Sequence, residues 1–188
     1  MRQLAPMLVG TLLTGLMTGL PAARADQPSP LYALVDTAAA RLQTADPVAA
    51  FKWVKGGSIE DAPRVAQVLD AVAADATGHG IDPQPVRVLF ENQIHATEGI
   101  EYARFGQWKL DPATAPTAAP DLSASRAAID RYNHQMVGEL ALHQDSLNGP
   151  DCSIALDQAK TAVVADRSLD PLYQQALTLA TSSYCTPT

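Results

Sequence analysis

The sequence predicts an all-α fold: a single-domain helical bundle of about six or seven helices. Apolar residues recur three and four positions apart along nearly the whole chain, and no segment shows the strict alternation of a β-strand. Four pairs of a capping residue and a first-turn proline, which begin at Ser29, Asp46, Asp82 and Asp170, indicate helix starts. The chain has 188 residues, of which 47% are apolar, so it is long enough for one domain and too apolar for a disordered protein.

The first 25 residues are typical of a cleaved signal peptide. Arg2 supplies a positive start, the run from Met7 to Leu20 is apolar or small throughout, and Ala23-Arg24-Ala25 has the small-x-small pattern of a cleavage site. A membrane anchor is the alternative, but this run is shorter than the roughly 20 apolar residues that span a bilayer. We therefore expect cleavage after Ala25, a mature helical domain of residues 26–188 and a secreted or periplasmic location.

The first three expected helices follow one another closely. The first spans about residues 31–42, and the second runs from Asp46-Pro47 to about Lys55, where two glycines end it. Ser58 is expected to cap the third helix, with Asp61 three residues later as its capping-box partner. Gly78 and Gly80 would end that helix.

The second half of the chain predicts four more helices. A long helix begins at Asp82-Pro83 and continues past Phe105, and a Pro-rich segment at 111–120 follows it as a linker or an active-site cover. Asp121 or Ser123 then caps a helix that extends to about Leu147. Two final helices are expected near 152–166 and 171–184.

Charge and cysteine content exclude several classes of function. The formal net charge of −7 becomes −9 when Arg2 and Arg24 leave with the signal peptide, so we expect no binding to nucleic acid and none to membranes after cleavage. Export to an oxidising compartment favours a disulfide between Cys152 and Cys185 over two buried free thiols. With no third cysteine and no C-x-x-C, neither a cysteine zinc site nor a redox pair is expected.

Four cations, on four separate expected helices, are the first candidates for a binding site: Arg41, Lys52, Arg64 and Arg126. Each borders an apolar stripe, and such a side chain can simply cover apolar surface with its stem while its charge stays in water. If the four converged instead, they would form a pocket for a small anion with more than one carboxylate.

The long helix carries a second candidate pair. Thr97 and Glu101 are four residues apart and therefore lie on one helix face, which is otherwise apolar. The alternative for Glu101 is an exposed ion pair with Arg104, which would contribute little to stability.

Metal binding and nucleophilic catalysis find no support in the sequence. Glu91, His95 and Glu98 have the spacing of metal ligands on one helix, but a dimetal bundle also needs Glu-x-x-His motifs, and the chain contains none. There is also no G-x-S-x-G motif. We expect neither a metal site nor a metal cofactor.

Several segments together resemble the secreted chorismate mutases, the exported gamma subclass of the AroQ class. The resemblance covers roughly residues 31–185 and is densest in RLQTADPVAAFKW (41–53), IEDAPRV (59–65), ATEGIEYARFGQWKLDP (96–112) and PDLSASRAAID (120–130). It implies an all-helical, cofactor-free isomerase that converts chorismate to prephenate by a pericyclic rearrangement. It further implies a homodimer in which each cationic pocket is completed within one chain, and it supports the disulfide.

The resemblance also assigns roles to individual residues. Chorismate carries two carboxylates, and Arg41, Arg64 and Arg126 would hold them so that the substrate adopts its folded reactive shape. Thr97 would add a neutral hydrogen bond. Lys52 would meet the negative charge that grows on the ether oxygen as its C–O bond breaks. Lys52, Glu101 and Arg126 are therefore the expected catalytic residues.

Three positions depart from the family pattern or have a second interpretation. Short cytoplasmic relatives carry glutamine where this chain has Glu101, so we expect this carboxyl to be protonated in the complex. Val68 replaces a residue that is polar in some relatives. Asp61 matches a position that can bind the ring hydroxyl, yet it is also the expected capping-box partner of Ser58.

An exported helical binding protein for a small dicarboxylate, without catalysis, is the alternative function. Such a protein could dispense with Lys52 and Glu101, and this chain retains both.

Overall fold

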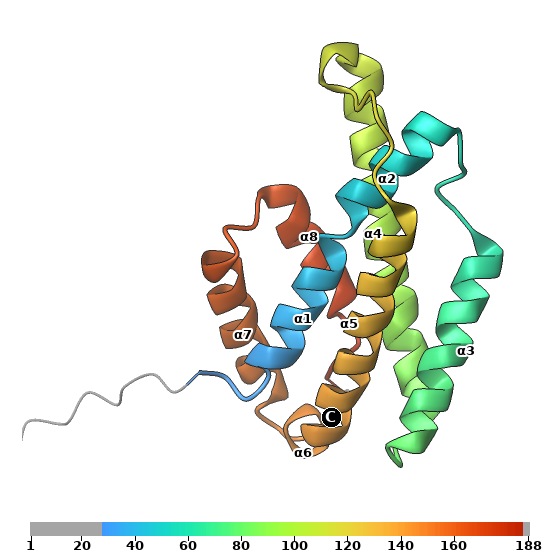
Figure 1. The fold of residues 1–188 in the computed structure, drawn as a ribbon. Helices are drawn as coiled ribbons and strands as arrows, with labels where there is room; N and C mark the ends of the chain where they lie inside the picture. The colour runs from blue at the N-terminus through green and yellow to red at the C-terminus, as the bar shows by residue number, and fades with distance from the viewer. Residues whose placement is uncertain (1–27, 186–188) are drawn as a thin grey trace, which may run out of the picture.

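The computed structural model describes residues 28–185, and within this range it contains helices and no strand (Figure 1). This confirms the all-α prediction. The predicted signal peptide and its cleavage site lie outside the described residues. The elements are α1 (Tyr32–Leu42), α2 (Ala45–Lys55), α3 (Ala62–Gly78), α4 (Pro83–Leu110), the 3-10 turn η1 (Pro112–Thr114), α5 (Leu122–Leu142), α6 (Gln144–Leu147), α7 (Cys152–Asp166) and α8 (Pro171–Ala180).

Helix α4 is the longest element and connects the two halves of the bundle. Its 28 residues extend over about 42 Å, and it packs against α8, α3, α2 and α1. Its carboxyl-terminal end projects beyond the body of the molecule together with η1 (Figure 1). The predicted Pro-rich segment follows there and leads back to α5.

Helix α1 lies at the centre of the core and contacts α5, α7, α8 and α4. Leu34, Val35 and Leu42 are fully buried, and Ala38 and Ala39 between them are equally inaccessible to solvent. Small side chains on a central helix let its neighbours approach closely, which a close-packed interior requires. The last turn of this buried helix carries Arg41 into the protein interior.

Aspartate side chains cap four of the helices, as the sequence predicts for most of them. Asp82 accepts a hydrogen bond from the backbone N–H of residue 84, Asp121 from that of residue 123 and Asp170 from that of residue 173. These caps satisfy N–H groups that have no partner inside their helices.

Three predicted helix starts are wrong. Helix α1 begins at Tyr32 without a side-chain cap, so Ser29-Pro30 lies before it. Asp61 itself caps α3, by accepting from the backbone N–H of Arg64 at 3.1 Å, so Ser58 lies before the helix and is not its cap. The cause is Pro63 in the first turn, which has no N–H and fits there without loss. Helix α2 begins at Ala45, ahead of the expected Asp46-Pro47 start, and has no side-chain cap.

Two predicted helix ends also fall too late. Helix α5 ends at Leu142, and the single turn α6 continues after an interruption at His143. Helix α8 ends at Ala180, before the expected position near residue 184. No helix among the described residues is both long enough and apolar enough to cross a membrane.

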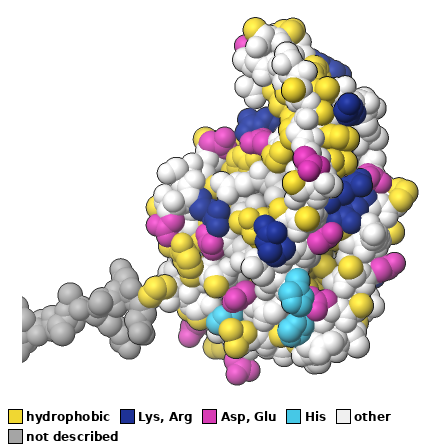
Figure 2. Space-filling model, in the orientation of Figure 1, with side chains coloured by type: hydrophobic (Ala, Val, Ile, Leu, Met, Phe, Trp, Pro, Cys, Tyr) yellow, Lys and Arg dark blue, Asp and Glu magenta, His cyan; other side chains and the backbone are white. Residues whose placement is uncertain are grey.

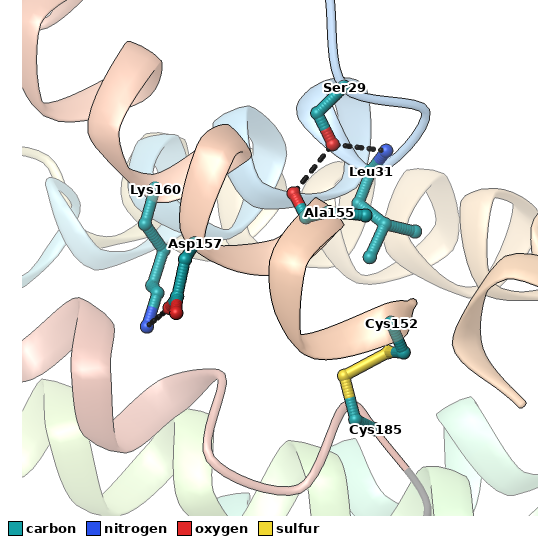
Figure 3. Close-up of a disulfide and its surroundings, with 7 residues drawn as sticks. All are labelled: Ser29, Leu31, Cys152, Ala155, Asp157, Lys160 and Cys185. Carbon is teal, nitrogen blue, oxygen red and sulfur yellow. Dashed lines mark hydrogen bonds and ion pairs between the residues drawn. A yellow bond between two sulfur atoms is a disulfide. The ribbon is translucent and has the colours of Figure 1, made fainter. Parts of the chain in front are cut away.

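The disulfide between Cys152 and Cys185 is present, with a Cα–Cα distance of 5.8 Å (Figure 3). It ties the first residue of α7 to the segment after α8, as predicted. A second contact anchors the start of the described chain to the same helix, because the Ser29 hydroxyl donates to the Ala155 carbonyl at 2.6 Å. Both links lie on α7, which carries none of the residues predicted to bind a ligand.

We expect removal of this disulfide to destabilise the fold without damaging the site. The bond closes a loop with a sequence separation of 33, for which the chain-entropy model gives about 3–4 kcal/mol. Thermal unfolding of a Cys152→Ala/Cys185→Ala double variant should therefore show a Tm about 6–16 °C below that of the wild type. Lys160→Ala, which removes the surface pair with Asp157, should leave the Tm nearly unchanged. A double variant with the wild-type Tm would contradict this.

Candidate active site

A cavity of about 590 Å³ opens between α1, α2, α3, α4 and α5, a size typical of small-molecule sites. All of the predicted site residues line this cavity: Arg41, Lys52, Asp61, Arg64, Thr97, Glu101 and Arg126. The interpretation of the four cations as separate side chains covering apolar surface is therefore wrong. They come from four helices, as the sequence predicts.

Arg41 forms the buried end of the site. It is only 4% exposed, its Nε donates to Asn133 Oδ1 at 2.7 Å, and its Nη1 donates to Thr97 Oγ1 at 3.3 Å. Its guanidinium also lies 6.0 Å from the centre of the Phe90 ring. Burial lowers the pKa of Arg41 to about 10, so it stays charged at neutral pH.

Thr97 supports Arg41 in this arrangement. Its hydroxyl donates to the Gln93 carbonyl at 2.8 Å while its oxygen accepts from Arg41. The hydroxyl proton is thus engaged by the backbone of the preceding turn, a common bond for a helical threonine. Thr97 acts here as an acceptor that helps to fix the orientation of the guanidinium.

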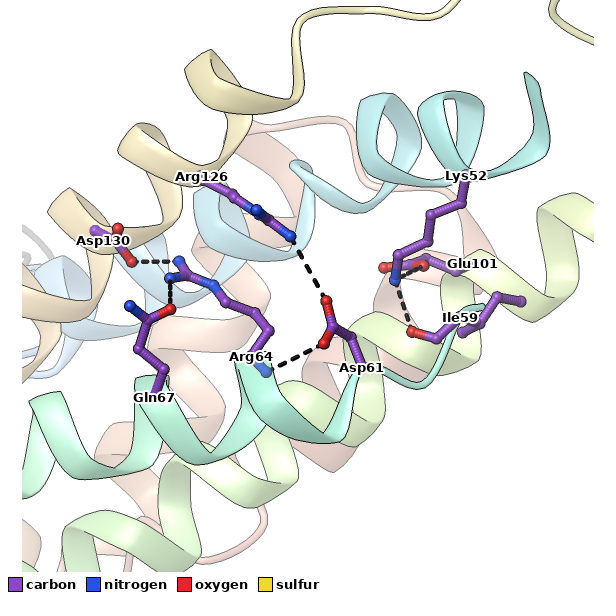
Figure 4. A network of polar contacts seen from close by, with 8 residues as sticks. All are labelled: Lys52, Ile59, Asp61, Arg64, Gln67, Glu101, Arg126 and Asp130. Carbon is purple, nitrogen blue, oxygen red and sulfur yellow. Dashed lines mark hydrogen bonds and ion pairs between the residues drawn. The ribbon is translucent and has the colours of Figure 1, made fainter. Parts of the chain in front are cut away.

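Lys52 on α2 and Glu101 on α4 form an ion pair at the wall of the cavity. Lys52 Nζ lies 2.8 Å from Glu101 Oε2 and donates to the Ile59 carbonyl at 2.6 Å (Figure 4). An ammonium group has three donors, so one remains for a ligand oxygen in the cavity. The predicted alternative pair of Glu101 with Arg104 is wrong, because Arg104 instead binds Asp46 at 2.6 Å.

Glu101 is almost completely buried, with 2% of its surface exposed. Burial raises the pKa of this carboxyl above its ordinary value, and the hydrogen bond from Lys52 opposes that shift only in part. The protonated form is therefore easier to reach than in an exposed glutamate. Glu98, one turn earlier on α4, also lines the cavity, and burial raises its pKa too.

Arg64 and Arg126 lie toward the more open side of the cavity, each beside a carboxylate (Figure 4). Arg64 donates to Asp130 at 2.6 Å and to Gln67 at 2.7 Å. Arg126 Nη2 lies 3.5 Å from Asp61 Oδ2, and both of these side chains are more than a third exposed. These two guanidinium groups are therefore positioned by partners that water can also reach.

Asp61 uses its two carboxylate oxygens for two different contacts. One oxygen caps α3 through the Arg64 N–H, and the other faces Arg126. Because a carboxylate has two oxygens, its capping role leaves one of them toward the cavity. Val68, one turn after Arg64, lines the same cavity with an aliphatic side chain and is 5% exposed.

The cavity is less positive than its cations alone suggest. Four carboxylates line it beside the four cations: Glu60, Asp61, Glu98 and Glu101. The face shown in Figure 2 likewise carries basic and acidic side chains interspersed, without a continuous basic surface. Positive charge in this site is local and depends on which carboxylates are ionised.

Sequence reasoning missed three residues that hold the cations: Gln67, Asp130 and Asn133. Asn133 is 5% exposed and binds Arg41. A signal was available, because residues 126, 130 and 133 follow the i, i+4, i+7 spacing of one helix face. Asn133 lies on the same face of α5 as Arg126. A polar residue on a buried helix face indicates that it has a polar partner in the core.

Comparison with known proteins assigns this arrangement to a family. The family model for chorismate mutase type II matches residues 32–102. The chain is 53% identical over 180 residues to the secreted chorismate mutase of Mycolicibacterium smegmatis, which covers 95% of this chain and 99% of that protein. It is 54% identical over 167 residues to the secreted chorismate mutase of Mycobacterium tuberculosis, with coverage of 89% and 84%.

Solved structures agree with the sequence comparison. The chorismate mutase of Burkholderia phymatum superposes with a TM-score of 0.80 at 28% identity, over 85% of this chain and 98% of that one. The chorismate mutase of Burkholderia thailandensis gives a TM-score of 0.77 at 32% identity, over 84% and 99%. Because it is 53% and 54% identical to two secreted chorismate mutases over most of its length and shares the fold of solved chorismate mutases, this chain belongs to the chorismate mutase family.

Proposed function

We propose that this protein is a chorismate mutase that acts outside the cytoplasm and converts chorismate to prephenate without a cofactor. The observation that carries the proposal is the convergence of Arg41, Lys52 and Glu101 in one cavity, in a chain that shares 53% of its residues with a secreted member of the family. The comparisons give no support to the alternative of a binding protein without catalysis.

The reaction needs no proton transfer and no covalent intermediate. In one concerted step, the ether C–O bond of chorismate breaks while a new C–C bond forms between the enolpyruvyl group and the ring. The protein must therefore hold the substrate in its folded conformer and stabilise the charge that develops. A rate enhancement on the order of 10⁶ corresponds to about 8 kcal/mol of barrier reduction.

The arginines bind the two carboxylates of the substrate and so hold its folded conformer. Arg41 is buried and fixed by Asn133 and Thr97, so it can bind one carboxylate without rearranging. Arg64 and Arg126 are positioned to bind the other carboxylate at the open side. Their present partners, Asp130 and Asp61, are exposed enough that each pair contributes about 0–1 kcal/mol. A substrate carboxylate can therefore replace or share these contacts at little cost.

Lys52 and Glu101 supply the stabilisation of the transition state. The free donor of the Lys52 ammonium would bind the ether oxygen, and this bond strengthens as negative charge grows there. An interaction that is stronger in the transition state than in the ground state raises kcat. Protonated Glu101 would donate a second hydrogen bond to the same oxygen, whereas ionised Glu101 would repel the developing charge.

The quaternary structure and the ring contacts remain parts of the proposal. We propose that the enzyme is a homodimer, which sedimentation velocity on the mature chain would test. Asp61 would accept from the ring hydroxyl of chorismate with the oxygen that does not cap α3, a role compatible with its two contacts.

Replacing Lys52 by alanine should abolish most of the activity. We expect kcat for the conversion of chorismate to fall at least about 10²-fold, because the main charge that faces the ether oxygen is removed. The measurement is the disappearance of chorismate with purified, disulfide-bonded mature protein. Lys55→Ala is the matched control, since Lys55 lies one turn later on α2 and is exposed. Equal loss in both variants, or full activity in Lys52→Ala, would contradict the assignment.

The activity should fall as the pH rises through the pKa of Glu101. Burial raises this pKa, so the protonated, donating form is present below it and is lost above it. We expect kcat of the wild type to decline as the pH rises, with a midpoint above the ordinary pKa of a glutamate. In Glu101→Gln the amide donates at every pH, so that decline should disappear.

Glu98→Gln is the control for this pH profile, because Glu98 also lines the cavity and its pKa is also raised. Lys52 and Glu98 are the charged groups that act most strongly on Glu101. If Glu101 carries the effect, the Glu98 variant retains the decline. A wild-type profile that is flat, or a decline that only Glu98→Gln removes, would overturn the role of Glu101.

A further inference from the structure

Three potential metal ligands meet on the outer side of the α3–α5 pair, away from the cavity described above. Asp75 lies on α3, His79 follows it by one turn, and His134 comes from α5. His134 Nδ1 is 2.8 Å from Asp75 Oδ2, and His79 Nε2 is 3.7 Å from Asp75 Oδ1. Each side chain has a ligand atom within 4.8 Å of those of the other two.

We propose that these three residues form a binding site for a divalent transition metal of the zinc class. Zinc binds histidine nitrogen and carboxylate oxygen at about 2.0–2.2 Å. In tetrahedral coordination, such bonds place neighbouring ligand atoms about 3.3–3.6 Å apart. The distances of 2.8 and 3.7 Å, which reach different oxygens of the Asp75 carboxylate, lie on either side of this range. Because the three ligand atoms already lie within 4.8 Å of one another, rotation of these side chains would bring them around one ion.

The chemistry of the donors selects the kind of ion. Two imidazoles and one carboxylate suit zinc and related ions, whereas calcium and magnesium prefer oxygen ligands alone. Three protein ligands leave a fourth position for water or for an external ligand. This set of residues differs from Glu91, His95 and Glu98, which have the spacing of metal ligands on a single helix.

The surroundings keep the Asp75 carboxylate available to an ion. Among the ion pairs of the described residues, Asp75 is paired with the two histidines and with no lysine or arginine. The His134 side chain is 72% exposed, so an ion can reach the site from solvent without any opening of the fold. Figure 2 shows histidine side chains beside acidic ones at the protein surface.

A bound ion would connect the two helices that carry the outer arginines of the cavity. Arg64 lies near the start of α3 and Arg126 near the start of α5, whereas Asp75 and His134 lie further along the same helices. Metal bonds between Asp75, His79 and His134 would therefore hold α3 against α5 and stabilise the folded state by mass action. The site itself does not depend on the proposed enzymatic activity.

Titration of the metal-free protein with zinc tests the proposal. Mature protein treated with a chelator is titrated with ZnCl₂ by calorimetry, and its Tm is followed over the same range of zinc concentration. We expect saturable binding of one Zn²⁺ per chain and a Tm that rises with zinc. His134→Ala should weaken binding at least about tenfold and remove the rise in Tm, and Asp75→Asn should act in the same direction.

His143→Ala is the matched control, because His143 pairs with Glu139 on the same helix and lies outside the cluster. It should bind zinc like the wild type. Absence of saturable binding would overturn the proposal and leave the Asp75–His134 contact as a surface hydrogen bond. Binding that survives in His134→Ala but is lost in His143→Ala would overturn it as well. Visible absorption of bound Co²⁺ should report nitrogen and oxygen ligands in the wild type.

Discussion

The burial of a guanidinium at the end of α1 is the constraint on which the site depends. Arg41 is 4% exposed, and a buried charge without partners costs several kcal/mol. Its partners are Asn133 on α5 and Thr97 on α4, so the charge is satisfied only when α1, α4 and α5 pack in one register. The same three helices form the closed end of the cavity. The fold and the binding site are thus stabilised by one set of hydrogen bonds.

The charges around the cavity differ systematically from its closed end to its open side. At the closed end, Arg41 is fixed by neutral partners, and its charge is available to an anion. Between the two ends, Lys52 and the buried Glu101 are paired at 2.8 Å. At the open side, Arg64 and Arg126 have exposed carboxylate partners that a substrate can replace at low cost. A fixed charge at the closed end and exchangeable pairs at the open side would suit the binding of a dianion, as the proposed function requires.

Most of the fold could be predicted from local signals. Helical periodicity and the Asp-Pro pairs located the long helix after Asp82 and the last helix after Asp170, and both aspartates are caps in the structure. Two of the errors have specific physical causes, one local and one distant in the sequence. Asp61, rather than Ser58, caps α3. The Asp46 carboxylate binds Arg104, a residue 58 positions away, and does not cap α2.

The sequence by itself determined most of the helices, the disulfide and the residues that line the cavity, because periodicity, caps, cysteine content and family motifs are local features of the chain. Only the tertiary structure decided which of these residues touch. Lys52 meets Glu101 across 49 positions, Arg41 meets Asn133 across 92, and His134 meets Asp75 across 59. Such partners depend on the relative rotation and register of packed helices. That packing is set by the whole core at once, so no local pattern reports it.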